Sequence, residues 1–342
     1  MKGGGIKRIG IIGAGAWGTA LALVARRAGL DVVIQAREAN VVDAINETQD
    51  NKIFLPGVAL DKGIRATASI ADAIEGDEGA ADALLLTVPA QFLRAAMGEL
   101  ADSIKPGIPI VICAKGIEQD TGALMSEIAA EVLTDTPVLV LSGPTFAAEV
   151  AAGLPAAVTL ACQDDDLAVK VSDALAGPMF RIYRSDDLIG AQIGGAVKNV
   201  LAIGCGIVDG RGLGDNARAA LITRGLSEIV RLGLAKGARA ETLMGLCGIG
   251  DLVLTCNAVQ SRNFSLGVAL GRGEALANIV DARSSVAEGV FSAASVSGLA
   301  RTLGVDMPLC LAVDGILNHF ADIDATIEGL LSRPMKQETA QE

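Results

Sequence analysis

The sequence has one histidine, one tryptophan and one tyrosine in 342 residues, and aromatic residues make up only 3% of it. A Ser-His-Asp triad, a histidine-ligated zinc site or the His-Asp pair of many dehydrogenases needs a suitably placed histidine. The single histidine, His319, lies near the end of an apolar helical segment, where a cap or a packed surface position is expected. Chemistry that depends on histidine is therefore excluded.

Paired cysteines are also missing, because the six cysteines are scattered without a Cys-x-x-Cys motif and most lie in apolar segments. We expect reduced, buried thiols, no metal centre and a cytoplasmic protein. Basic residues are few, since 28 Lys and Arg stand against 40 Asp and Glu for a net charge of −12. This acidic balance argues against nucleic acid as a partner.

Two apolar segments resemble membrane signals. Residues 9–25 follow basic residues as in a signal peptide, but their glycines form a pattern with another explanation, given below. Residues 188–208 are long enough to span a bilayer, yet they include five glycines, a glutamine and an asparagine. A helix in the protein core fits this second segment better, so no membrane span is expected.

Two patterns of hydrophobicity divide the chain. The first half alternates helical segments with short apolar strands, expected at 6–12, 32–35, 83–88, 109–114, 137–141, 156–161 and 180–183. Strands without polar alternation, separated by helices, predict an α/β fold with a mostly parallel sheet covered on both faces. From residue 188 helical periodicity dominates. We therefore predict a dinucleotide-binding domain over 1–187, an all-helical substrate domain over 188–334 and a polar tail over 335–342.

A glycine pattern, Gly13-x-Gly15-x-x-Gly18, follows the first expected strand and opens the first expected helix. In a dinucleotide fold the first glycine makes the tight turn, the second lets the pyrophosphate approach the backbone, and the third allows close helix packing. This context predicts cofactor binding rather than a glycine-rich turn alone. Arg37 follows the second strand where NAD sites usually have an acidic residue, which favours NADP, although Glu38 keeps NAD as the alternative.

Two polar motifs follow later strands, at the sheet edge where open parallel sheets bind ligands. Lys115 is the only charged residue from 106 to 117, and it can orient a carbonyl or a phosphate, or simply close the strand. Residues 142–147 combine a Gly-Pro turn with Thr145, which can cap the next helix. This second motif is also compatible with an ordinary helix start.

Lys198 is the only charged side chain between Asp187 and Asp209. Burial of an unpaired ammonium is unfavourable, so its pKa falls, and a lysine pKa of about 7–8 suits a general acid. Gly194 and Gly195 lie one turn earlier on the same face, where they would leave room for a ligand. We predict a catalytic lysine, with a structural ion pair as the alternative.

A last polar group combines Asp251 with the run Ser261-Arg262-Asn263. At a helix start this run offers a hydroxyl, a planar cation and backbone amides, which suits a phosphate, although an ordinary capped helix is the alternative. Asp251 can hold Lys198, but a close carboxylate would raise the lysine pKa against the effect of burial. The sequence leaves that balance open.

In their order, these motifs resemble those of the bacterial NAD(P)-dependent glycerol-3-phosphate dehydrogenases over residues 9 to about 303. The motifs that carry the resemblance are 13–18, 114–116, 142–147, 197–199, 250–256 and 261–263. The resemblance implies an N-terminal Rossmann-type domain followed by an all-helical domain like the C-terminal one of 6-phosphogluconate dehydrogenase. It also implies a homodimer that reduces dihydroxyacetone phosphate, a small phosphate substrate, to sn-glycerol 3-phosphate for phospholipid synthesis.

The resemblance further implies roles for individual residues. Lys198 corresponds to the proton donor and acceptor, and the other predicted catalytic residues are Lys115, Asp251 and Asn199. Expected substrate contacts are Lys115, Gly143, Thr145, Lys198, Asp251, Ser261, Arg262 and Asn263. Expected cofactor contacts, for NADP or alternatively NAD, are Gly13, Gly15, Ala16, Trp17, Gly18, Arg37, Lys115, Ala147, Arg262, Val286 and Glu288.

Three residues depart from the pattern of the family. Ala16 stands where many members have a serine, so a phosphate-binding hydroxyl is missing, while Cys247 and Phe264 replace more common residues beside the substrate motifs. Two alternatives stay open. A ketopantoate or β-hydroxyacid reductase would share the fold and the helix lysine but not the Ser-Arg-Asn site. A non-catalytic NADP-sensing protein would need no Lys198.

Overall fold

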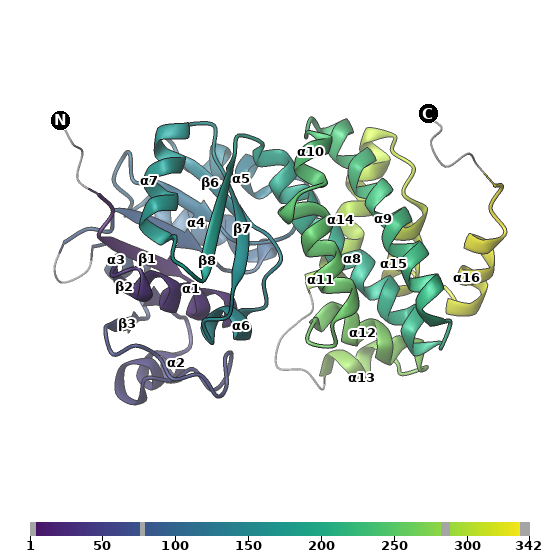
Figure 1. The fold of residues 1–342 in the computed structure, drawn as a ribbon, viewed down its shortest axis with the longest axis horizontal. Coiled ribbons are helices and arrows are strands. Elements are labelled where there is room, and N and C mark those ends of the chain that lie inside the picture. Colours follow the sequence, from purple (N-terminus) through teal and green to yellow (C-terminus); the bar gives the residue numbers. More distant parts are fainter. Residues whose placement is uncertain (1–4, 76–78, 282–287, 336–342) are drawn as a thin grey trace.

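The computed structural model describes residues 5–75, 79–281 and 288–335. A helix-covered sheet and a bundle of helices lie side by side along the long axis of the molecule (Figure 1). The described strands form one sheet in the order β3-β2-β1-β4-β5-β6-β7-β8. Their bounds are β1 (Arg8–Ile12), β2 (Asp31–Gln35), β3 (Ile64–Thr67), β4 (Ala83–Leu86), β5 (Ile110–Ile112), β6 (Val138–Ser142), β7 (Ala156–Ala161) and β8 (Phe180–Ser185).

The strand order identifies the fold. Neighbouring strands pair in parallel except β6 and β7, which are antiparallel. The order from β3 to β6 is that of a Rossmann fold, in which the direction of winding reverses between β1 and β4 and ligands bind at the carboxyl ends of the strands. The predicted Rossmann-type, mostly parallel sheet is therefore confirmed. The sequence did not predict β3, which is four residues long and has only Ile64 buried.

Helices cover both faces of the sheet, which explains why its strands lack polar alternation. On one face Ile11 packs in a core with α1 and α7, and on the other Leu84 packs with α4 and α5. The helical elements of this half are α1 (Ala16–Arg27), α2 (Ala39–Asp43), η1 (Ala44–Thr48), α3 (Ile70–Glu75), η2 (Ala90–Phe92), α4 (Leu93–Ala101), α5 (Met125–Val132), α6 (Ala147–Ala151) and α7 (Asp165–Leu175).

After β8 every regular element in the described residues is a helix. The long helix α8 (Leu188–Gly210) begins with Asp187, whose carboxylate accepts the Gly190 N–H at 2.8 Å. The other elements pack around it or around one another (Figure 1). They are α9 (Gly214–Lys236), α10 (Ala240–Leu243), η3 (Leu246–Gly250), α11 (Asp251–Asn257), α12 (Arg262–Gly271), α13 (Leu276–Asp281), α14 (Glu288–Leu303), α15 (Pro308–Asn318) and α16 (Ile323–Leu331).

Helix α8 is a core helix, as predicted. It has the length and composition of a membrane span, but its most apolar stretch is completely buried inside the protein. Glycines let its backbone touch that of α12, because a Cβ at Gly206 would overlap the carbonyl oxygen of Phe264. Close contact between two helix backbones explains why the segment contains so many glycines.

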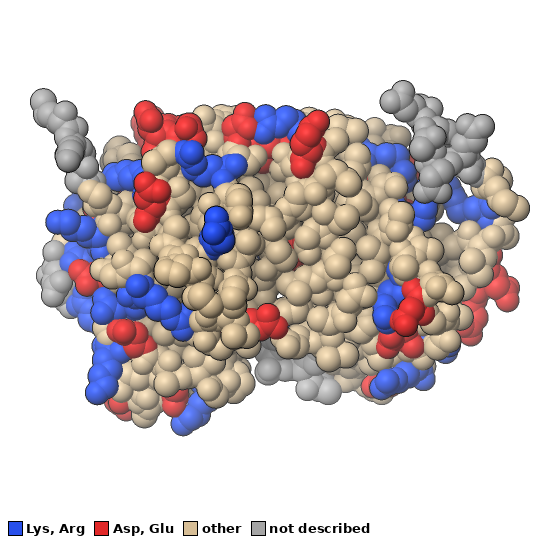
Figure 2. All heavy atoms as spheres, viewed as in Figure 1, with Lys and Arg blue, Asp and Glu red and all other residues tan. Residues whose placement is uncertain are grey.

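The remaining compositional predictions concern cysteine, histidine and charge. All six cysteines are free and buried, and His319 is the C-cap of α15 with a side chain 65% exposed, as predicted. On the face seen in Figure 2, acidic and basic side chains are interspersed and the middle of the face is largely uncharged. Of the predicted polar tail, residues 336–342 lie outside the described residues.

Candidate active site

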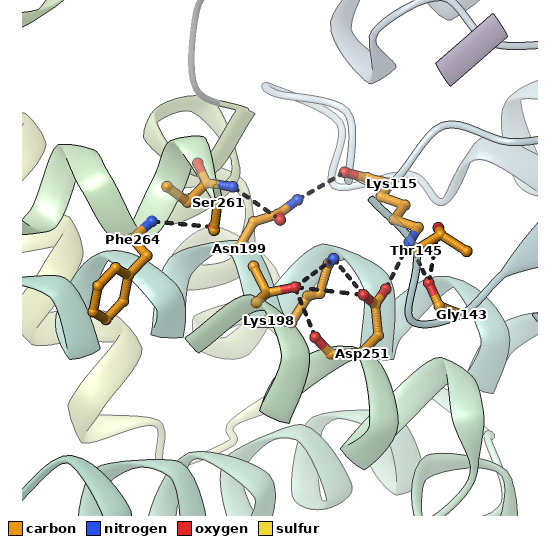
Figure 3. A network of polar contacts seen from close by, with 10 residues as sticks. Lys115, Gly143, Thr145, Lys198, Asn199, Asp251, Ser261 and Phe264 are labelled. Carbon is orange, nitrogen blue, oxygen red and sulfur yellow. Dashed lines mark hydrogen bonds and ion pairs between the residues drawn. The ribbon is translucent and has the colours of Figure 1, made fainter. Parts of the chain in front are cut away.

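Three charged side chains from distant parts of the sequence meet between the sheet and the helices (Figure 3). Asp251 accepts a hydrogen bond from Lys198 Nζ at 2.6 Å through Oδ1 and one from Lys115 Nζ at 2.6 Å through Oδ2. Asp251 is fully buried at the start of α11, and Lys198 in α8 is 6% exposed. Lys115 follows β5 at the carboxyl edge of the sheet, so the two regions share one carboxylate.

Close backbone packing brings Asp251 beside Lys198. A Cβ at Gly194 would overlap the carbonyl oxygen of Cys247, so no side chain separates α8 from η3. The expectation that Gly194 leaves room for a ligand is therefore wrong, because the backbone of η3 fills that space. A Cβ at Gly195 would lie 3.1 Å from Ser142 Oγ and 3.3 Å from Lys115 Cγ. Both glycines thus serve the packing around the lysines.

Burial and charge act in opposite directions on Lys198. Burial lowers the pKa of Lys198 from 10.5 to about 8, although the Asp251 carboxylate raises it, and the charge of Lys115 lowers it further. The balance that the sequence left open is thus decided by burial. Two ammonium groups around one carboxylate leave an excess of positive charge in a buried place, which favours an anion nearby.

Thr255 completes the surroundings of Lys198. Its hydroxyl accepts from Lys198 Nζ at 2.8 Å and donates to the Asp251 carbonyl oxygen at 2.7 Å. The sequence motif contained this threonine, but sequence reasoning gave it no role. Its spacing of four residues from Asp251 was the available signal, because residues i and i+4 share a helix face.

Lys115 is held from the sheet side by the turn after β6. Its Nζ donates to the Gly143 carbonyl oxygen at 2.8 Å, and the Thr145 hydroxyl donates to the same oxygen at 3.3 Å. Gly143 has φ +151°, and a Cβ there would lie 2.9 Å from Val158 Cα, so the turn requires glycine. The motif ends at Ala147, the first residue of α6.

A chain of amide side chains continues the network toward α12. Asn199 Nδ2 is 3.4 Å from the Lys115 carbonyl oxygen, and Asn199 Oδ1 accepts from Asn263 Nδ2 at 3.0 Å. Asn263 Oδ1 in turn accepts the Gly289 N–H at 3.0 Å, which ties α12 to α14. The Ser261 hydroxyl caps α12 by accepting the Phe264 N–H at 3.2 Å (Figure 3). The helix-cap interpretation of Ser261 is correct, and its O–H can still donate.

Glu288 links the helices to the segment after β4. Burial raises the pKa of Glu288, whereas the positive charge of Arg262 and a hydrogen bond from the Ala90 backbone lower it. Arg262 itself is exposed at the first position of α12. Val286, another predicted cofactor contact, lies outside the described residues.

The glycine turn after β1 fits a dinucleotide phosphate. Gly13 has φ +107°, and a Cβ at Gly18 would overlap the Gly13 carbonyl oxygen, so two glycines are required by the protein itself. A Cβ at Gly15 would meet nothing within 4 Å, which leaves open space beside the first turn of α1. Ala16 and Trp17 begin α1, and Gly15 has no side chain that could cap it. Uncapped backbone N–H groups with the helix dipole bind anions.

Arg37 lies at the edge of the same site, exposed, with its guanidinium carbon 5.7 Å from the centre of the Phe92 ring. Phe92 is 52% exposed, so its ring can form a cation–π contact with Arg37 at the protein surface. Sequence reasoning singled out Arg37 and not Phe92. Only the fold brings the end of β2 next to η2.

Comparison with known proteins agrees with this geometry. Two family models match, described as the N-terminus and the C-terminus of NAD-dependent glycerol-3-phosphate dehydrogenase, over residues 8–168 and 187–328. The chain is 56% identical over 332 residues to glycerol-3-phosphate dehydrogenase (NAD(P)+) of Caulobacter vibrioides, which covers 97% of this chain and 99% of that protein. This chain belongs to the NAD-dependent glycerol-3-phosphate dehydrogenase family.

Further relatives support the same family. The Rhodospirillum rubrum protein of that name is 56% identical over 338 residues, which are 98% of this chain and 95% of that protein. The crystal structure of glycerol-3-phosphate dehydrogenase from Coxiella burnetii superimposes with a TM-score of 0.92 at 39% identity, and the match covers 96% of this chain and 99% of that chain. The resemblance predicted from the motifs is thus confirmed.

The structure brings most predicted site residues together. One hydrogen-bonded network contains Lys115, Gly143, Thr145, Lys198, Asn199, Asp251 and Asn263. Ser261 and Arg262 are neighbours of Asn263 in the chain, and Glu288 is near Arg262 and both lysines. The roles predicted for these residues in substrate and cofactor binding stay predictions.

Proposed function

We propose that this chain interconverts dihydroxyacetone phosphate and sn-glycerol 3-phosphate, with Lys198 as the proton donor and acceptor. Family membership confirms the prediction of an NAD(P)-dependent oxidoreductase. The observation that carries the proposed mechanism is the buried carboxylate of Asp251 between Lys198 and Lys115, both at 2.6 Å. A site with this excess of positive charge suits an anionic substrate whose reduction creates a negative oxygen.

The two lysines have separable tasks in this mechanism. Bound NAD(P)H supplies the hydride. Lys198, with a pKa of about 8, holds a proton at neutral pH and can give it to the ketone oxygen, or take it back in the oxidation direction. Lys115 polarises the same carbonyl, while Asp251 fixes both Nζ atoms and Thr255 orients that of Lys198. Asn199, beside Lys198 in α8, holds the backbone of Lys115 and the amide of Asn263.

We assign the substrate phosphate to the beginning of α12. Arg262 provides a planar cation on its first turn, next to the Ser261 hydroxyl and the Asn263 amide, and backbone N–H groups of a helix start favour an anion. Gly143 and Thr145 bound the other side of the substrate, next to Lys115. Anchoring the phosphate at a distance from the carbonyl holds that carbonyl in position for reaction.

We assign the cofactor to the sheet half of the chain. Its contacts would be Gly13, Gly15, Ala16, Trp17, Gly18, Arg37, Lys115 and Ala147, with Arg262, Val286 and Glu288 from the helical half. Arg37 favours NADP, because a guanidinium pairs well with a 2′-phosphate. We further propose a division into residues 1–187 and 188–334, a cytoplasmic homodimer, and a product used as the backbone of phospholipids.

Absorbance of NADPH tests the reaction directly. Purified protein should oxidise NADPH when dihydroxyacetone phosphate is added, faster than it oxidises NADH, and should leave ketopantoate unchanged. Turnover of ketopantoate in place of the phosphate substrate would support a related reductase instead. Binding of NADPH without turnover of either ketone would contradict catalysis altogether.

A further inference from the structure

The carbonyl groups of the glycine turn are all held by the protein. The four consecutive carbonyl oxygens of residues 12–15 each accept a hydrogen bond: from the Thr87 N–H at 2.9 Å, the Thr87 hydroxyl at 2.6 Å, Asn51 Nδ2 at 2.8 Å, and the Thr19 hydroxyl at 2.9 Å. Thr87 and Thr19 belong to the segments that flank the turn in the fold. Asn51 comes from a separate loop, between η1 and β3.

The Asn51 side chain has no unused hydrogen-bonding group. Its two N–H donors reach the Ala14 carbonyl oxygen at 2.8 Å and the Thr19 hydroxyl oxygen at 2.9 Å. Its Oδ1 accepts the Phe54 N–H at 3.2 Å, and the residue is 1% exposed. The Thr19 hydroxyl in turn donates to the Gly15 carbonyl oxygen. Asn51 therefore holds the Ala14 carbonyl directly and the Gly15 carbonyl through Thr19.

The loop that carries Asn51 is itself anchored. The Asn51 carbonyl accepts the Leu55 N–H at 2.8 Å, and the Leu55 side chain is buried in the core under the sheet. The Leu60 N–H donates to the Gln49 carbonyl at 2.8 Å, which closes the loop. Asn51 is therefore held in place independently of the turn that it contacts.

The direction of these carbonyls matters for an anion. A carbonyl oxygen that points at a pyrophosphate repels it, whereas backbone N–H groups and the positive end of α1 attract it. A Cβ at Gly15 would meet nothing within 4 Å, so there is open space beside the turn. A hydrogen bond that fixes the Ala14 peptide therefore also fixes the donors that face the phosphate.

We propose that Asn51 is a positioning residue for cofactor binding, which orients the Ala14 and Gly15 peptides so that the turn presents N–H groups to the pyrophosphate. The inference rests on the proposed use of NAD(P)H, and it adds a residue that contacts the turn rather than the ligand. Asn51 should influence the affinity for the cofactor and leave the chemistry at Lys198 unchanged.

Two variants and a matched control test this role. Asn51→Asp keeps the acceptor for Phe54 but cannot donate to Ala14 or Thr19, and Asn51→Ala removes all three side-chain contacts. Asn46→Ala is the control, because Asn46 makes two hydrogen bonds to the Ala66 backbone from the same region and none to the turn. NADPH binding is followed by quenching of Trp17, the one tryptophan of the chain, and unfolding in urea is measured for each variant.

We expect both Asn51 variants to raise the Kd for NADPH by about 10- to 100-fold, the usual effect of a lost buried hydrogen bond and its unpaired acceptor. The KM for NADPH should rise in parallel, while kcat at saturating cofactor and the KM for dihydroxyacetone phosphate stay within about twofold. Asn46→Ala should bind NADPH like the wild type. General destabilisation of the protein would not give this pattern, so the pattern would support a positioning role for Asn51.

Three results would overturn the inference. One is an unchanged Kd in a folded Asn51 variant, and another is an equal loss of affinity in Asn46→Ala. A third is the failure of both Asn51 variants to fold, which would make Asn51 a requirement of the fold itself. A wild-type protein that does not bind NADPH would instead remove the proposed function and this inference together, so the two failures are distinguishable.

Discussion

The two halves of the molecule use glycine and charge in opposite ways. At the turn of the sheet half, residues 13–18 contain no charged side chain, and Gly15 leaves space beside backbone N–H groups. In the helical half Gly194 leaves no space, because η3 fills it, and this contact sets a carboxylate beside Lys198. A cofactor phosphate can thus be met by oriented peptides, whereas proton transfer needs an ammonium whose pKa burial has lowered.

Removal of the Lys198 side chain should distinguish the roles of the two halves most clearly. We expect Lys198→Ala to lower kcat by about 10²–10⁴-fold, because the proton donor is lost, while the Kd for NADPH stays within about twofold. Steady-state kinetics and a binding titration check both values. Lys170→Ala, at an exposed position of α7, is the control and should change neither. Near wild-type turnover in Lys198→Ala would contradict the assignment of this lysine.

Arg262 tests whether the helical half also recognises the phosphate. Arg262→Ala should lower kcat/KM for dihydroxyacetone phosphate. The fall should correspond to a loss of transition-state stabilisation of about 2–4 kcal/mol, the range for a lost guanidinium–phosphate contact. The comparison substrate is dihydroxyacetone, which lacks the phosphate. At saturating NADPH, where a change in cofactor affinity does not limit the rate, both enzymes should turn it over equally. An equal loss with both ketones would show that Arg262 acts on something other than the phosphate.

The close contact of α8 with η3 is tested by adding a single methyl group. Gly194→Ala should reduce the free energy of unfolding by about 1–3 kcal/mol, since a Cβ overlaps the Cys247 carbonyl oxygen. Gly98→Ala is the matched control, because Gly98 is an exposed position in α4 with nothing within 4 Å of an added Cβ. It should stabilise by about 0.5–1 kcal/mol. Similar urea midpoints for the two variants would contradict this packing.

The smallest effect is expected in the dependence of the rate on pH. The pKa of Lys198 is lowered to about 8, so ketone reduction should slow by about tenfold per pH unit above that value, while glycerol phosphate oxidation speeds up until the lysine is neutral. Because Asp251 raises the lysine pKa, Asp251→Asn should move the fall in kcat/KM to lower pH. If the pH profile did not move in Asp251→Asn, the group that controls the rate would not be Lys198.

Motifs with a local physical cause could be predicted from the sequence. The β1–turn–α1 glycines and the solitary charge of Lys198 each stand out because their neighbours are small or apolar. Helix α7 has local signals that the interpretation of strands and motifs did not use, because Asp164 caps it and Ala168, Val171 and Leu175 are buried at helical spacing. Local chemistry was thus sufficient where one residue differs sharply from its surroundings.

Residues that act across the fold could not be predicted in this way. Asn51 stands in a polar loop, and only the folded chain shows that it reaches the Ala14 carbonyl thirty-seven positions away. The contact of Arg37 with Phe92 likewise joins the end of β2 to η2, which lies far along the sequence. Gly194 was recognised as special, but the reason was misjudged because η3 lies more than fifty residues further on. Such contacts carry no periodic or compositional signal.

The sharing of the Asp251 carboxylate between Lys115 and Lys198 has a consequence for the integrity of the enzyme. Lys115 belongs to the part of the chain before α8, whereas Lys198 and their shared counter-ion Asp251 both belong to the part that begins with α8. If the gene were cut between β8 and α8, the two fragments would be inert by themselves, and mixing them should restore turnover only to the extent that they reassociate. Activity in such a complementation assay would therefore report docking of the fragments as directly as any binding measurement.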